Sequence, residues 1–291
     1  MCKTVGKSLS SLTKIEKMRY IHWFVAVLVV VFSSCSSDDS ASTDKNPVDN
    51  SGVTSYFPLK SNNYWTYKTE NVSVNPIAIG RDSIYVGNDS IINSITYKRM
   101  KTKSLPTGFF CGALRNNGLR VDGKMVKLSG DVSVNIGASL PVAFSVTDFV
   151  IFKEDATTLE KLATVSGTVI DETALPGYPL TVSYTLSAKE DGSLPTLTSD
   201  GKEYSDIKKV KLILNLKVTA QVGEFSINVL SSDNQDVLVS NQYYAKNLGL
   251  VKSETNINYS LNPLIGELTT VDFPLSSSQT TNDYLLTKLI N

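Results

Sequence analysis

Apolar and polar side chains alternate along much of the chain, most clearly between residues 209 and 219. Every second residue from Val210 to Val218 is valine or leucine, whereas most residues between them are lysine or asparagine. Successive side chains of a strand point to opposite faces, so this period predicts a strand with one buried and one solvated face. Strands of this kind are typical of antiparallel sheets.

Runs of β-branched and aromatic residues continue the pattern through residues 55–291, and Gly, Asn-Pro and Asp-Gly separate them. Such runs, bounded by turn residues, predict strands. The predicted strands cover residues 64–68, 82–86, 90–97, 109–115, 119–121, 132–136, 142–152, 164–171, 180–188, 207–220, 224–230, 237–245, 250–259 and 268–273.

Three short segments predict turns, at residues 87–89 (Gly-Asn-Asp), 116–118 (Asn-Asn-Gly) and 122–123 (Asp-Gly). The Asn-Gly pair is the strongest hairpin signal, because both central positions of a type I′ turn need a positive φ. In contrast, residues 156–163 have the spacing of a short helix. Residues 283–290 are predicted to form either a final strand or a short helix.

We therefore predict an all-β fold with little helix. It is a single large antiparallel domain over residues 55–291, built either as a sandwich or as a curved half-barrel. Helices do not alternate with strands in the rhythm of a parallel sheet. A domain of this length can bury a substantial core.

The most apolar stretch of the chain precedes this domain and runs from Ile21 to Phe32. As a helix it would span about 18 Å, whereas the hydrocarbon core of a bilayer is about 30 Å thick. The run instead has the length of the hydrophobic segment of a signal peptide, with Arg19 as the positive residue before it. A signal peptide that starts at Met18 would have an ordinary length, so we predict that translation begins there.

Residues 32–35 (Phe-Ser-Ser-Cys) follow this run and resemble a lipobox, the motif at which bacterial lipoproteins are diacylated and cleaved. The resemblance implies that residues 1–34 are a signal peptide and that Cys35 carries the lipid. Two acyl chains give stable anchoring to a membrane. The alternative is an ordinary secretory signal with an incidental cysteine.

Residues 35–54, which begin with Cys35, are rich in Ser, Asp, Asn, Thr and Gly and predict a flexible linker. Fully extended, residues 36–54 reach about 65 Å. The acidic pair Asp38-Asp39 resembles the export signal of surface-exposed Bacteroidetes lipoproteins. This resemblance implies display on the outside of the outer membrane, and the alternative is its periplasmic face.

Removal of the signal peptide would change the chemistry that the chain can perform. Residues 1–34 hold five basic residues and one acidic residue, and the whole chain holds 28 of each, so the mature chain has a net charge of −4. This balance argues against nucleic-acid binding, which needs a basic face. The only histidine, His22, leaves with the signal, which excludes Ser-His-Asp and Cys-His nucleophile systems and the usual zinc sites. Cys111 is predicted to be a buried thiol.

Two aromatic segments resemble a known family. Residues 56–67 contain Tyr-Phe-Pro-Leu and then Tyr-Trp-Thr-Tyr, and residues 243–254 read Tyr-Tyr-Ala-Lys-Asn-Leu-Gly-Leu-Val-Lys-Ser-Glu. This pair resembles a family of Bacteroidetes-type outer-membrane or surface lipoproteins, which combine an N-terminal FPL…WxY strand with a late YAK-x-x-GLVK strand. The resemblance implies a curved antiparallel sheet, as in the lipoprotein-carrier proteins that some relatives look like. It implies no catalytic residues.

These observations predict a lipid-anchored outer-membrane protein, exposed at the cell surface, that acts as a non-catalytic binding module for a lipid, glycan or protein partner. One alternative is a structural or accessory subunit of an outer-membrane assembly. Another is a histidine-free glycosidase that uses two carboxylates. No cofactor, no metal and no nucleic-acid partner is expected.

Few individual residues stand out as candidate sites. Trp65 is the only tryptophan after residue 34, and it is predicted either to pack in the core or to stack against a ligand. Asp-Ser-apolar segments at Ser40, Ser83 and Ser90 resemble the acceptor motif for O-glycosylation in Bacteroidetes. Ser40 lies in the linker, so it would be the most accessible of the three.

Overall fold

The structure is a computed structural model, and it describes residues 56–136, 140–172, 177–268 and 274–291. These residues all belong to one compact unit, residues 47–291. The predictions of a signal peptide over residues 1–34, of a start at Met18, of lipidation at Cys35, of a linker over residues 35–54 and of glycosylation at Ser40 lie outside the described residues.

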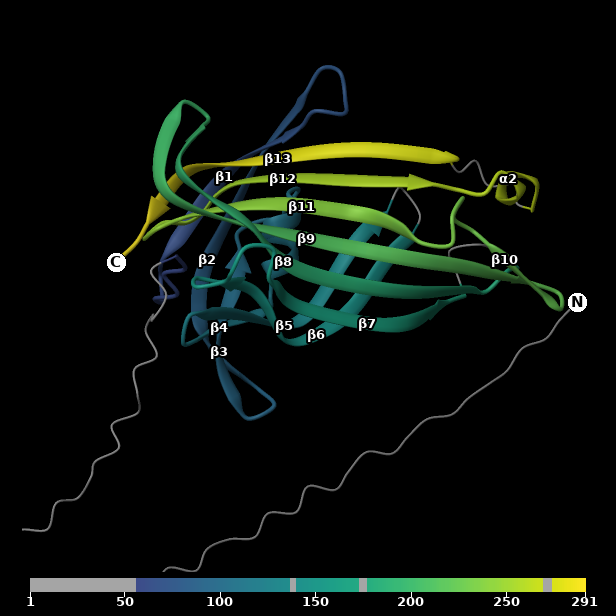
Figure 1. Ribbon diagram of the computed structural model, residues 1–291, viewed down its shortest axis with the longest axis horizontal. Coiled ribbons are helices and arrows are strands. Elements are labelled where there is room, and N and C mark those ends of the chain that lie inside the picture. The colour runs from purple at the N-terminus through teal and green to yellow at the C-terminus, as the bar shows by residue number, and fades with distance from the viewer. Residues whose placement is uncertain (1–55, 137–139, 173–176, 269–273) are drawn as a thin grey trace, which may run out of the picture. The chain divides into compact units, whose positions relative to one another are not determined.

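The described residues form thirteen strands and two short helices (Figure 1). In chain order they are β1 (Tyr64–Asn71), β2 (Ala78–Ile92), β3 (Ile95–Thr102), α1 (Phe109–Leu114), β4 (Gly118–Asp122), β5 (Met125–Ile136), β6 (Leu140–Lys153), β7 (Lys161–Asp171), β8 (Leu180–Ser199), β9 (Lys202–Val222), β10 (Phe225–Asn228), β11 (Gln235–Ala245), β12 (Gly249–Ser260), α2 (Leu264–Leu268) and β13 (Ser276–Leu289).

All of these strands belong to one antiparallel sheet in the order β6-β5-β4-β3-β2-β1-β13-β12-β11-β9-β8-β7, with β10 paired to β9. The sheet curls until its two ends approach each other, so that the ring of Phe144 on β6 stacks on Tyr184 of β8 with centroids 4.4 Å apart. The prediction of a single all-β antiparallel domain with little helix is confirmed. Of the two architectures considered, the sheet has that of the curved half-barrel.

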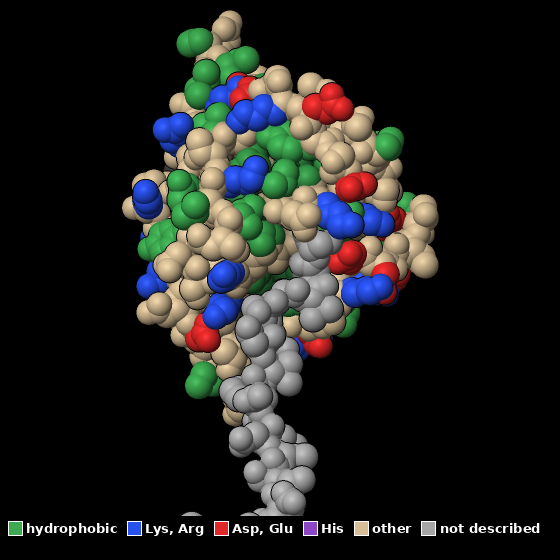
Figure 2. Space-filling view, turned by 90° about the vertical axis from the view of Figure 1, so that its left-hand side faces the viewer, with side chains coloured by type: hydrophobic (Ala, Val, Ile, Leu, Met, Phe, Trp, Pro, Cys, Tyr) green, Lys and Arg blue, Asp and Glu red, His purple; other side chains and the backbone are tan. Residues whose placement is uncertain are grey.

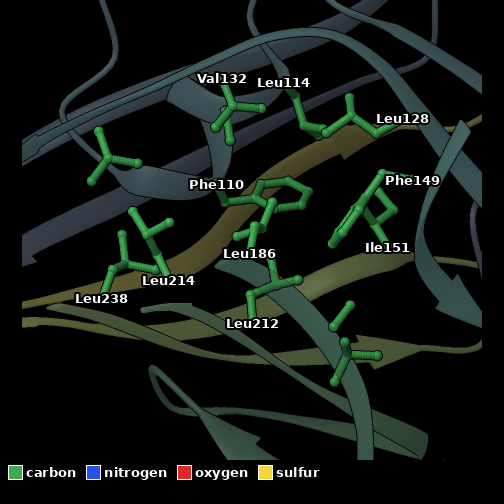
Figure 3. Close-up of a cluster of buried hydrophobic side chains, with 14 of the residues drawn as sticks. Phe110, Leu114, Leu128, Val132, Phe149, Ile151, Leu186, Leu212, Leu214 and Leu238 are labelled. Atoms are coloured by element: carbon green, nitrogen blue, oxygen red, sulfur yellow. The ribbon is translucent and has the colours of Figure 1, made fainter. Parts of the chain in front are cut away.

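The inner face of the curled sheet holds the core. The alternation predicted for residues 209–219 is confirmed in β9, where the residues from Val210 to Val218 on the apolar face are buried. Apolar side chains from α1 and from opposite parts of the sheet meet there (Figure 3). The figure labels Phe110, Leu114, Leu128, Val132, Phe149, Ile151, Leu186, Leu212, Leu214 and Leu238.

Residues 109–115, predicted as a strand, instead contain the helix α1. A short apolar run fits a buried helix as well as a strand, so the pattern alone does not distinguish them. The distinction comes from tertiary contacts, because Phe110 and Leu114 pack into the sheet's interior and Asp82, on the distant strand β2, accepts hydrogen bonds from the backbone just before the helix.

The hairpin turn predicted at residues 87–89 is wrong, because β2 continues through this segment with a bulge between Val86 and Asp89. The chain turns at Asn93 and Ser94, which both have positive φ values of 50° and 64°. These values suit a two-residue hairpin, but serine seldom adopts them, so the sequence pattern points less clearly to this turn.

The hairpin at residues 116–118 and the helix at residues 156–163 are also wrong. Residues 115–117 join α1 to β4, which begins at Gly118, and residues 154–160 connect β6 to β7, which begins at Lys161. In this second connection the Glu160 carboxylate accepts a hydrogen bond from the Thr157 backbone N–H and pairs with Lys153, and these contacts take the place of helical bonds.

Two of the remaining predictions are confirmed. The Asp122-Gly123 turn joins β4 to β5 in register, and residues 283–290 belong largely to β13, a strand paired with both β1 and β12. Of the strand predicted at residues 268–273, Leu268 ends helix α2, and the other five residues lie outside the described part of the chain.

Asn117 fastens α1 to the sheet, so we expect Asn117→Ala to destabilise the fold by about 2–4 kcal/mol. The buried Asn117 amide donates to the carbonyl oxygens of Ala113 and Asp131 at 2.8 and 2.7 Å and accepts from the Asp131 N–H at 3.0 Å. Urea denaturation would measure the loss. The control is Asn116→Gly at the exposed neighbour, for which a change below about 1 kcal/mol is expected; equal losses would contradict this role of Asn117.

Candidate functional site

The two segments that carry the family resemblance contact each other inside the curled sheet. Trp65 and Tyr67 lie on the buried face of β1. The Trp65 indole Nε1–H donates to the Leu248 carbonyl oxygen at 2.6 Å, and the Tyr67 hydroxyl donates to the Leu250 carbonyl oxygen at 3.2 Å. Because β13 separates β1 from β12 in the sheet, these two bonds join strands that are not neighbours.

The backbone around Gly249 is shaped for this contact. Gly249 has a φ of +91°, and a Cβ atom placed there would lie 3.3 Å from Nε1 of Trp65. Asn247 also has a positive φ, of 62°, which asparagine tolerates better than most residues. At the bend between β11 and β12, the backbone of Gly249, which has no side chain, therefore packs against the edge of the indole ring.

Aromatic rings complete the junction between the segments. The ring of Phe57 lies 5.7 Å from that of Tyr244 on β11, and Phe152 on β6 lies 5.0 Å from Tyr244. Tyr56 in turn lies 5.4 Å from Phe152. The signature residues that resemble the lipoprotein family therefore form part of the core.

A small cavity lies beside this junction. Its walls include Phe57, Trp65, Tyr67, Gly249 and Leu250, and its volume is about 10 Å³. A space of this size holds about one water molecule, which is far less than a lipid or a sugar needs. Trp65 itself is 3 % exposed, so the structure places it in the core rather than on an open platform.

Asp82 on β2 is a buried carboxylate that holds the segment before α1. Its oxygens accept hydrogen bonds from the Thr107 N–H at 3.0 and 3.1 Å and from the Gly108 N–H at 2.7 Å. The Thr107 hydroxyl also donates to Asp82 at 3.2 Å. Both oxygens of the Asp82 carboxylate therefore have hydrogen-bond donors from within the fold.

Asp283 on β13 is a second buried carboxylate, held between strands on either side. It accepts hydrogen bonds from the Thr69 hydroxyl on β1 at 3.0 Å and from the Ser253 hydroxyl on β12 at 2.7 Å. Burial raises the pKa of Asp283 to about 6, the two hydroxyl donors partly oppose the rise, and the charge of Asp82 adds to it. A methyl group added at Gly108 would overlap the Asp283 carboxylate, so these atoms are closely packed.

The described residues contain no group of three or more His, Cys, Asp or Glu side chains placed to hold a metal ion. Cys111 on α1 is a buried free thiol, as predicted, and burial raises its pKa well above the usual range. Ser83 and Ser90 lie on β2 and are half-buried. Glycosylation at these two serines stays a prediction.

Lysine and tyrosine side chains alternate across five neighbouring strands on the outer face of the sheet. Tyr243 on β11 lies in register with Lys209 on β9 and Lys252 on β12, and Tyr284 on β13 with Lys252 and with Lys68 on β1. The ammonium groups lie 4.9–5.8 Å from ring centroids in the Lys209–Tyr243, Lys252–Tyr243 and Lys68–Tyr284 pairs. The protein's own cations therefore lie over these rings, which favours a role in cross-strand stabilisation.

A second exterior feature is the hairpin that joins β1 to β2, which projects beyond the sheet at the top of Figure 1. Exposed apolar side chains lie on this hairpin and on the loop after β3, and we call them the apolar tip. Its members are Val72, Val74, Ile77, Ile79 and Leu105, which are 38–74 % exposed. Figure 2 shows hydrophobic side chains projecting at the top of this face, with charged side chains below them. Exposed apolar groups that cluster in this way mark interaction surfaces.

The sequence reading did not find Asp82, Asp283 or the apolar tip. Both aspartates carry a signal in the pattern, because each lies on the buried phase of its strand, Asp82 with Ile84 and Asp283 with Leu285. No pattern in the sequence predicts the contact between the two signature segments, because β13 lies between β1 and β12 in the sheet.

Comparisons with known proteins add little to this description. No protein-family model and no curated protein matches the chain. One similar solved structure is a protein from Bacteroides fragilis that is proposed to be exported and has a YmcC-like fold, with 9 % identity, a TM-score of 0.34, and coverage of 80 % of this chain and 98 % of that one. Another is a proposed lipoprotein from Parabacteroides distasonis, with the same identity and coverage and a TM-score of 0.36. At these scores the likeness carries no argument.

Neither helix in the part of the chain that the structure describes is long and apolar enough to cross a bilayer.

We expect Gly249→Ala to destabilise the fold, because the new methyl group meets both a positive φ and the Trp65 ring. The matched control is Gly192→Ala, where φ is +101° but no atom lies within 4 Å of the added carbon. The Gly249 variant should lose at least about 1 kcal/mol more than the control. Urea denaturation followed by circular dichroism measures both; losses of the same size would show that Trp65 does not constrain Gly249.

The raised pKa of Asp283 predicts that the native state loses stability as the pH rises. The native state binds the proton more tightly than the unfolded chain, where the pKa is about 3.8, so stability falls between about pH 4 and 6, by about 3 kcal/mol. In Asp283→Asn this part of the pH dependence should vanish. Chemical denaturation across this range measures it, and parallel profiles for the two proteins would contradict the prediction.

Asp148→Asn serves as the control for this experiment. Hydrogen bonds from the Arg120 guanidinium, at 2.8 and 2.6 Å, hold the pKa of Asp148 well below its usual range. Asp148 therefore stays ionised in the native state throughout the range from pH 4 to 6, and its stabilising contribution is lost only at lower pH. The Asp148 variant should be less stable across the range and keep the slope that Asp283→Asn loses.

Proposed function

We propose that this chain is a lipid-anchored, non-catalytic protein of the bacterial envelope that binds its partner through its exterior. One observation carries the proposal. The cavity beside the signature contact has a volume of about 10 Å³, while the apolar tip is exposed. A small ligand enclosed beside the signature contact would need a much larger space, which supports contacts with a partner at the exterior.

The anchor part of the proposal is supported by the sequence. Residues 32–35 resemble a lipobox, and an acidic pair, Asp38-Asp39, follows Cys35. The proposal places the acyl chains of Cys35 in the outer membrane and the folded domain on the cell surface, held by the linker of residues 36–54.

The environment of the buried carboxylates supports a non-catalytic role. A glycosidase needs two carboxyl groups that face a substrate in a cleft. Asp82 and Asp283 are at most 3 % exposed, and hydroxyl or backbone groups of the protein hydrogen-bond to both of them. Structural use within the fold explains both residues.

The apolar tip also supports the second candidate, an accessory subunit of an outer-membrane assembly. In that case a neighbouring protein would cover Val74, Ile77, Ile79 and the other members of the tip. A partner of this kind would be recovered by crosslinking at the tip on intact cells.

Native mass spectrometry of the protein purified from membranes tests the proposed function. We expect the mass of a chain that begins at Cys35 with diacylation, and no further lipid or sugar bound in stoichiometric amount, because the cavity beside the signature contact has room for about one water molecule. Cys35→Ala should lose the acyl mass and release the protein from the membrane fraction. A co-purifying ligand would contradict an exterior binding site, and an unmodified Cys35 would contradict the anchor.

Surface display is tested separately on intact cells. Protease added outside should remove the wild-type domain. Replacing Asp38 and Asp39 with alanine should protect it by retaining the protein on the periplasmic face, while acylation is unchanged. Protection of the wild-type domain in cells with an intact outer membrane would contradict surface display.

A further inference from the structure

The apolar tip is flanked by basic residues and by almost no acidic ones. Residues 71–81 and 99–110 include Arg81, Arg99, Lys101 and Lys103 but neither Asp nor Glu. Arg81, Arg99 and Lys103 are exposed, and Lys101 is half-exposed. We call these four residues the basic flank.

The basic flank and the apolar tip lie on neighbouring strands. Arg81 lies two residues after Ile79 on β2, on the phase opposite to the buried Asp82 and Ile84. Lys101 on β3 lies in register with Tyr85 of β2, and Leu105 follows on the same connection. Arg81 and Lys103 therefore lie beside the apolar tip, whereas Lys101 and Arg99 lie further from it along the sheet.

The nearest acidic residue is neutralised within the protein. Glu70 on β1 lies in register with Ile79, but its carboxylate lies 3.1 Å from the ammonium group of Lys68. Lys68 also pairs with Asp200 from the β8–β9 hairpin. This group of charges leaves the positive charge of the basic flank uncompensated at the tip.

We infer that the apolar tip inserts into the interfacial region of an anionic bilayer, the same bilayer that holds the acyl chains of Cys35. The inference rests on the lipid anchor of the proposed function and names the partner of this surface. Apolar side chains at the end of a projecting hairpin can enter the boundary between headgroups and acyl chains, while the cations behind them meet anionic headgroups.

The length of the chain before the domain is compatible with this arrangement. From Tyr64 at the start of β1 to Val74 at the tip, the hairpin extends at most about 33 Å at the rise of a strand. The linker of residues 36–54 can reach about 65 Å, so the anchor allows the far end of the hairpin to return to the membrane. The domain would then contact the bilayer at two places, the acyl chains and the tip.

The shape of the surface favours a bilayer over a second protein. The apolar tip is the end of a projecting hairpin, not a flat face or a groove (Figure 1). A stable protein interface buries about 800 Å² on each partner, which five side chains at a projecting end do not supply. A fluid headgroup layer instead adapts to a narrow projection.

Fluorescent labels at two exposed apolar positions test the inference on the full chain in its lipidated form. Ile77→Cys places the label at the tip, and Phe225→Cys places it on β10 as the matched control, since both native side chains are exposed. Cys111 is buried, so it does not compete for the label. The proteins are reconstituted in vesicles of roughly three parts phosphatidylcholine to one part phosphatidylglycerol, with doxyl-labelled lipid as quencher.

We expect quenching of the label at residue 77, stronger in these vesicles than in pure phosphatidylcholine, and none at residue 225. Reversing two charges of the basic flank, in Arg81→Glu with Lys103→Glu, should lower the docked-to-undocked ratio at least about tenfold. Lys161→Glu with Lys217→Glu changes the net charge equally at exposed positions elsewhere and should leave the ratio unchanged.

Three outcomes would overturn the inference: no quenching at residue 77, equal quenching at both positions, or the same effect from both pairs of charge reversals. Intact-mass measurement separates these from failure of the proposed function. A chain without acyl groups contradicts the anchor itself, whereas an acylated chain whose tip stays unquenched contradicts only the docking.

Discussion

A single sheet that curls on itself encloses a space that its own side chains must fill. In this protein Trp65 fills part of that space, and its indole reaches from β1 past β13 to the backbone at Leu248 and Gly249. The indole N–H and the Tyr67 hydroxyl both reach carbonyl oxygens, so neither buried polar group is left without a partner. Helix α1 fills the remaining space with Phe110 and Leu114. The signature pair of the chain is therefore best understood as a core contact that links β1 to β12 across β13.

The polar groups of the interior follow from that closure. A short helix inside a curled sheet brings backbone N–H groups away from water, and they need acceptors. Asp82 provides the acceptors for the segment before α1. Asp283 lies close to Gly108 of the same segment and links β13 to both of its neighbours through Thr69 and Ser253. The raised pKa of Asp283 shows that this arrangement carries a cost in stability at neutral pH.

The sequence predicts the repeated part of the fold well and its exceptions poorly. Alternation identifies β9 and most other strands because it depends only on which face of a strand is buried. The prediction of a strand at residues 109–115 is wrong because a helix and a strand bury a short apolar run equally well. The contact that favours the helix involves Asp82, which lies on another strand. The pattern does not predict the turn at Asn93 and Ser94, because serine is unusual at a turn position that needs a positive φ. At the candidate site, the sequence pattern singles out Trp65 and Gly249. It does not predict the contact between them, because that contact depends on the order of the strands in the sheet.

We propose that the protein meets other molecules through its exterior, where charge would influence its orientation. Residues 35–291 have a net charge of −4, so an anionic surface would repel them weakly at long range. At physiological ionic strength charges interact over about 8 Å, so only the residues nearest the surface contribute to the energy of contact. In the basic flank, Arg81 and Lys103 lie beside exposed apolar groups, and residues 71–81 and 99–110 contain no carboxylate side chain. Screening therefore supports the proposed orientation, in which the apolar tip faces the membrane and the acidic remainder of the chain does not.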